Sequence, residues 1–118
     1  MKRSIVGAVL FAASVACNAD SIPIPGGVFM SGNDYMQLLP PQRVLYLEGA
    51  MDGLMTGGIS MQGIQEIGRC AQKMHLVSTQ LRAIADKYMQ AHPEHWGEPM
   101  TVSLFSALSD ACQSIGAK

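Results

Sequence analysis

The stretch VSTQLRAIADKYMQAHP, residues 77–93, decides the fold class. Its apolar residues recur at intervals of three and four, which places them on one face of a helix with 3.6 residues per turn. They are Val77, Leu81, Ile84, Ala85, Tyr88 and Met89. We therefore predict an amphipathic helix that is capped by Ser78 or Thr79 and runs to about Ala91. Pro93 ends it, because proline cannot continue the hydrogen-bond ladder of a helix.

The sequence on either side of this stretch predicts further helices. Apolar residues share one helical face over residues 42–55, and Glu98-Pro99 opens a last helix that continues to about Ser114. A short helical turn is predicted over residues 35–39. No segment sustains the period-two alternation of a half-buried strand. We expect an all-α domain, a small bundle of about four helices with a glycine-rich loop and one disulfide.

The glycine-rich segment is residues 56–69, which we interpret as a loop with at most a short helical turn over residues 64–67. A loop of this length in a small domain is often functional, although it can equally serve only as a connection. The preceding helix contains Gly49 and Gly53, four residues apart. Each glycine costs about 1 kcal/mol relative to alanine in a helix interior, so we expect another backbone to approach closely there. The candidate partner-binding residues are Asp52, Gly57, Gly58, Ser60, Met61, Gln62 and Gln65.

The first residues of the chain have the pattern of a signal peptide. Lys2 and Arg3 precede an apolar stretch over residues 4–13, and small residues follow up to Ala19. We expect a signal peptide over residues 1–19, a domain over residues 20–118, and an exported, periplasmic protein. Cys17 leaves a second possibility open, because acylation of that cysteine would anchor the chain to a membrane. No other association with a membrane is expected.

Cleavage of that segment would leave two of the three cysteines, Cys70 and Cys112. An even number of cysteines in an exported chain favours a disulfide. Closing a loop of this length stabilises a fold by about 4 kcal/mol in the chain-entropy model. A redox or nucleophilic cysteine is the alternative, but the sequence has no C-x-x-C motif.

Composition and motifs argue against several function classes. Lys and Arg number 8 against 9 Asp and Glu, so no basic excess points to nucleic acid. The sequence contains no G-x-S-x-G or H-E-x-x-H motif, and we predict that the protein is not an enzyme and needs no cofactor. His92 and His95 flank Pro93-Glu94, but Pro93 breaks regular helical geometry and no third metal ligand is identifiable. We interpret both as surface or turn histidines, with no metal site.

Several short motifs, in this order and spacing, resemble a known family. The first group is Phe29-Met30-Ser31-Gly32-Asn33-Asp34-Tyr35 and Tyr46-Leu47-Glu48-Gly49-Ala50-Met51-Asp52-Gly53. The second is Cys70, Gln80-Leu81 through Lys87-Tyr88-Met89, His92-Pro93-Glu94, and Ala107-Leu108 through Ala111-Cys112. Together they resemble the Tai, or resistance-associated, family of type VI secretion immunity proteins over nearly all of residues 20–118.

The resemblance implies a small periplasmic helical protein that inhibits a peptidoglycan amidase toxin injected by sister or neighbouring cells. It implies a loop that plugs the active-site groove of the toxin, often from a homodimer, and it supports a bridge between Cys70 and Cys112. The chain departs from the family pattern in lacking a second cysteine pair, in residues 35–39 and 44–47. The alternative function is a periplasmic helical stress protein, chaperone or envelope accessory protein.

Overall fold

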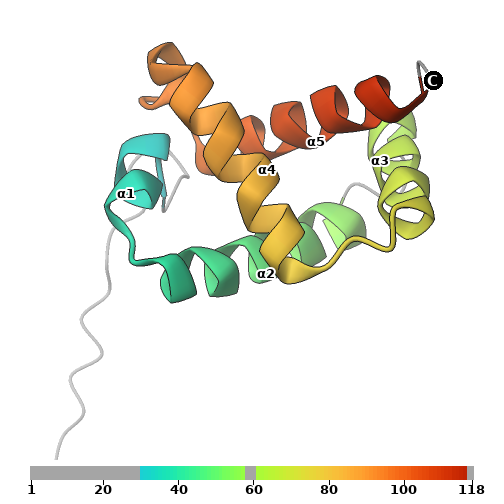
Figure 1. The fold of residues 1–118 in the computed structure, drawn as a ribbon, viewed down its shortest axis with the longest axis horizontal. Coiled ribbons are helices and arrows are strands. Elements are labelled where there is room, and N and C mark those ends of the chain that lie inside the picture. Colours follow the sequence, from blue (N-terminus) through green and yellow to red (C-terminus); the bar gives the residue numbers. More distant parts are fainter. Residues whose placement is uncertain (1–29, 58–60, 117–118) are drawn as a thin grey trace, which may run out of the picture.

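The structure is a computed structural model that describes residues 30–57 and 61–116. These residues form five α-helices and a short 3₁₀ turn, shown in Figure 1. In chain order they are α1 (Gly32–Gln37), α2 (Pro40–Gly57), α3 (Gln62–Lys73), α4 (Ser78–Ala91), the 3₁₀ turn η2 (Pro93–His95) and α5 (Met100–Gly116). The all-α prediction is confirmed. The segment interpreted as a signal peptide, with Cys17, lies outside the described residues.

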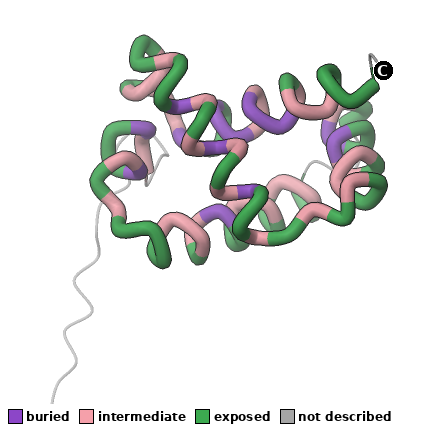
Figure 2. Tube along the Cα trace, viewed as in Figure 1, coloured by how far each residue is buried: buried purple, intermediate pink, exposed green. Residues whose placement is uncertain are grey.

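Helix α4 occupies the centre of the fold and packs against both α2 and α5 (Figure 1). Its buried residues are Leu81, Ala85 and Met89, spaced four apart on the predicted face. Helix α5 buries a matching stripe, because Met100, Leu104 and Leu108 have no exposed surface. In Figure 2 the buried positions of these helices face the interior between them. The same core cluster includes Tyr35 of α1, Leu47 of α2 and Ile67 of α3.

The start of α4 differs from the predicted cap. Val77 is the residue before the helix, and its backbone N–H donates to the side-chain oxygen of Gln80 at 3.2 Å. The hydroxyl of Ser78 instead donates to the carboxylate of Glu48 on α2. A contact between helices therefore replaces the local cap.

The interpretation of residues 56–69 as a loop was wrong. Helix α2 continues to Gly57, and α3 begins at Gln62, so the connection is much shorter than predicted. The glycines within α3 serve close packing: a Cβ on Gly63 would lie 3.3 Å from the Phe105 ring, and one on Gly68 would lie 3.4 Å from the Met55 sulfur. Burial of Ile64 and Ile67 on the same side of α3 stabilises this helix by tertiary packing despite its low intrinsic propensity.

The disulfide between Cys70 and Cys112 is confirmed, with Cα atoms 6.0 Å apart. It joins α3 to α5 across a sequence separation of 42 residues. Helix α3 contributes two buried side chains, fewer than α4 or α5. Of the two helices that the covalent link joins, α3 has the smaller share of the core.

Removal of this disulfide in a Cys70→Ala/Cys112→Ala variant is expected to lower the free energy of unfolding by about 2–4 kcal/mol. The loss arises because the open chain gains conformational entropy when it unfolds. Urea denaturation followed by circular dichroism measures it. Dithiothreitol should destabilise the wild-type protein and leave the double variant unchanged. Equal stability of variant and wild type would contradict a stabilising role for the bridge.

A partly buried polar network connects α1, α2 and α4. The phenol of Tyr35 donates to Asp86 Oδ1 at 2.7 Å, and Arg43 Nη1 donates to the same oxygen at 3.1 Å. Arg43 also donates to the carbonyl oxygens of Met36 and Leu38, at the end of α1. Burial, together with the hydrogen bond to Asp86, raises the pKa of the Tyr35 phenol above its ordinary value. One arginine therefore fixes the angle between α1 and α2.

Tyr35→Phe is expected to lower the free energy of unfolding by about 1–2 kcal/mol, because the carboxylate of Asp86 loses a buried hydrogen-bond donor. Tyr46→Phe is the matched control: the Tyr46 ring lies 6.1 Å from that of Tyr35, but no described residue hydrogen bonds to its hydroxyl. Chemical denaturation compares the two variants. An equal loss in both would show that the Tyr35 hydroxyl contributes nothing specific.

Candidate functional site

An apolar groove of about 560 Å³ lies where α2, α3 and α5 meet. Helix α2 contributes Ala50, Gly53, Leu54 and Gly57, the start of α3 contributes Met61 and Ile64, and α5 contributes Thr101, Val102 and Phe105. No charged residue lines it, and Thr101 is the one polar side chain among these residues. Met61 is 62% exposed and Val102 is 49% exposed, so solvent reaches the groove walls. The concave surface is therefore almost entirely apolar.

The α2 wall of this groove is made largely of residues with little or no side chain. A Cβ placed on Gly49, Gly53 or Gly57 would meet no atom within 4 Å. The prediction that another backbone approaches Gly49 and Gly53 was therefore wrong within the described chain. Gly49 and Gly53, in the helix interior, weaken α2 by about 1 kcal/mol each relative to alanine, without a packing gain among the described residues. They leave a bare strip of backbone beside the groove.

Gly53→Ala is expected to raise the free energy of unfolding by about 0.5–1 kcal/mol, because the added methyl enters open space and alanine favours the helix. Gly63→Ala should give less gain, since its methyl would press on Phe105. Thermal and urea denaturation of both variants measure the difference. Equal gains at the two positions would show that packing at Gly63 does not matter.

The structure distributes the predicted partner-binding residues over three surfaces. Gly57 and Met61 line the apolar groove, and Asp52 lines a second groove of about 720 Å³ with a mixed polar and apolar lining. The side chain of Gln62 donates to Glu66 at 3.0 Å, and Gln65 lies in a shallow hollow with Met55 and Arg69. Gly58 and Ser60 lie outside the described residues. The five described positions therefore do not line a single groove.

The sequence did not predict the α5 wall of the apolar groove. The spacing of apolar residues in this helix would place Val102 and Phe105 on one face with Leu108 and Cys112. In the structure Leu104 takes the buried position instead, and Val102 turns toward solvent. Both the face that includes Val102 and the face that includes Leu104 obey helical spacing. Only tertiary packing decides which of the two faces is buried.

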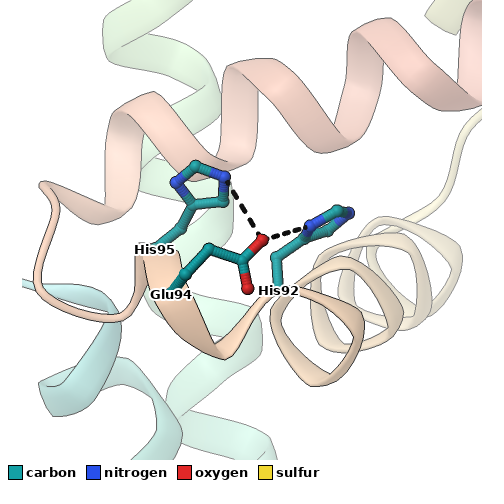
Figure 3. Close-up of side chains that lie close together, drawn as sticks. All are labelled: His92, Glu94 and His95. Atoms are coloured by element: carbon teal, nitrogen blue, oxygen red, sulfur yellow. Dashed lines mark hydrogen bonds and ion pairs between the residues drawn. The ribbon is translucent and has the colours of Figure 1, made fainter.

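The structure also gathers the two histidines that flank Pro93-Glu94. Figure 3 shows His92 and His95 on either side of the Glu94 carboxylate. His92 Nδ1 lies 2.9 Å from Glu94 Oε1, and His95 Nε2 lies 3.7 Å from the same oxygen. The hydrogen bond from His92 is the main reason why the pKa of the Glu94 carboxyl is lowered. The turn η2 makes this arrangement possible. After α4 ends, Pro93 begins a 3₁₀ turn, whereas an extended segment would carry His95 away from His92.

Comparisons with protein-family models, with curated proteins and with solved structures find no match to this chain. None of the described helices combines the length and the hydropathy that crossing a bilayer would need. The grooves and the histidine turn are therefore interpreted from their own residues.

Proposed function

We propose that the protein is an immunity protein that binds and inhibits a peptidoglycan amidase delivered by type VI secretion. The resemblance of the short sequence motifs supplies the family and the class of toxin. The observation that carries a binding role is the apolar groove between α2, α3 and α5, because exposed apolar concavities mark sites of interaction in small proteins. The proposed location is the periplasm, where the amidase meets its cell-wall substrate and where a disulfide is stable.

The groove has two properties that suit a protein partner. Met61 and Val102 offer flexible and branched apolar side chains at its rim, and methionine adapts to irregular partner surfaces. Gly53 and Gly57 let a partner backbone approach α2 closely, because no side chain stands in the way. We propose that the corner between α2 and α3 enters the active-site cleft of the amidase and that the groove receives the rim of that cleft. A homodimer would present two such corners.

The test is protection of a bacterial host that exports the amidase encoded in the neighbouring reading frame to its periplasm. Co-expression of this protein should prevent lysis, and the purified protein should inhibit hydrolysis of peptidoglycan peptides. Lysis with every neighbouring amidase would overturn the proposal. Suppression of aggregation of unfolded clients, without amidase inhibition, would instead support the helical chaperone.

Val102→Lys is expected to weaken amidase binding at least about tenfold, because a charge then enters the desolvated groove. Leu39→Lys is the matched control, since Leu39 is 65% exposed and lies just before the opposite end of α2. Isothermal titration calorimetry measures both affinities. The groove is not the interface if the two variants bind with equal affinity.

A further inference from the structure

The turn that joins α4 to α5 brings three metal-ligating side chains together. One nitrogen from each of His92 and His95 and one oxygen of Glu94 all lie within 4.8 Å of one another. Two imidazoles and a carboxylate are a ligand set that Zn²⁺ uses in proteins, with water in the fourth position. Donor atoms that surround a tetrahedral Zn²⁺ at 2.0–2.1 Å are about 3.3 Å apart. The observed separations of 2.9 Å and 3.7 Å from the Glu94 oxygen bracket that value.

The backbone of this turn is held in place from both sides. The His92 N–H donates to the Tyr88 carbonyl at 3.0 Å, and the His95 N–H donates to the His92 carbonyl at 3.1 Å. The carbonyls of Trp96 and Glu98 accept hydrogen bonds from the start of α1, at 2.7 Å and 3.0 Å. These hydrogen bonds therefore fix the backbone positions from which the side chains of His92, Glu94 and His95 project.

The rings are also oriented by their neighbours. The Tyr88 ring lies 4.4 Å from the His92 ring and 6.1 Å from the His95 ring, measured between centroids. Tyr88 thus covers one side of the pair and limits how far either imidazole can rotate. As Figure 3 shows, both rings point toward the Glu94 carboxylate.

The carboxylate of Glu98 determines which nitrogen of His95 faces Glu94. Glu98 Oε1 lies 3.0 Å from His95 Nδ1, the nitrogen on the other side of the ring from the one near Glu94. A proton on Nδ1, donated to Glu98, leaves the lone pair of Nε2 free to bind a metal. Histidine ligands of zinc almost always carry such a second partner, which fixes the ring and raises its basicity. Four side chains of one short segment therefore form a ligand set with its supporting contact.

We propose that His92 Nδ1, His95 Nε2 and the Glu94 carboxylate bind one Zn²⁺ ion, with Glu98 orienting His95. The three side chains are half-exposed or exposed, so water can supply the fourth ligand. The site lies on the α4–α5 connection, apart from the apolar groove, and does not depend on the proposed amidase. It adds a metal-binding activity that the sequence pattern alone did not predict.

The test titrates the untagged full chain with Zn²⁺ in a Cys17→Ser background, so that no free thiol competes. Competition with a chromophoric chelator should give one ion per chain. His92→Gln and His95→Gln should each lower the affinity at least about 100-fold, and Glu98→Ala about 10- to 100-fold. His75→Asn is the matched control: His75 is exposed and has a φ of 51°, which asparagine tolerates.

Nuclear magnetic resonance of the same chain decides the matter without any substitution of the ligands. Zn²⁺ should shift the imidazole signals of His92 and His95 and leave those of His75 unchanged. Equal shifts of all three histidines, or equal loss of affinity in His75→Asn and His92→Gln, would overturn the site. Absence of one-to-one binding in the competition titration would overturn it as well.

Discussion

Helix α4 packs against both α2 and α5 and buries one face of its length, and this packing positions the other elements. Leu81, Ala85 and Met89 share one core cluster with a stripe of α5 residues that has the same spacing of four. The buried stripe on each helix covers about two turns. Burial of each large apolar side chain contributes about 1.5–3 kcal/mol. This contact positions both the apolar groove and the histidine turn. Helix α5 forms one wall of the groove, and the turn lies on the connection between α4 and α5.

Helix α3 depends on this framework and not on its own sequence. It lacks a side-chain cap at its start, contains two glycines, and buries Ile64 and Ile67 against its neighbours. The Cys70–Cys112 bridge ties its last turn to α5. The bridge and the buried isoleucines thereby hold α3, whose first turn forms one wall of the groove.

The sequence predicted the elements whose signals are local. Helical spacing located α4, and the count of cysteines indicated the bridge that the structure confirms. It failed over residues 56–69 because glycine usually marks a loop, whereas Gly63 and Gly68 permit close packing that only the tertiary structure reveals. The opposite error occurred at Gly53. We predicted that another backbone packs against this glycine, but the space beside it is open. For His92 and His95, the conformation after Pro93 decided the geometry, and helical periodicity carries no information about it.

The central claim is that the groove between α2, α3 and α5 is the surface that a peptidoglycan amidase contacts. Methionine methyl signals report on it directly, because Met61 stands at the groove rim while Met36 packs against the core at α1. Addition of the unlabelled amidase to methyl-labelled protein should shift or broaden the Met61 signal and leave the Met36 signal in place. An amidase complex that forms without any change at Met61 would contradict the account.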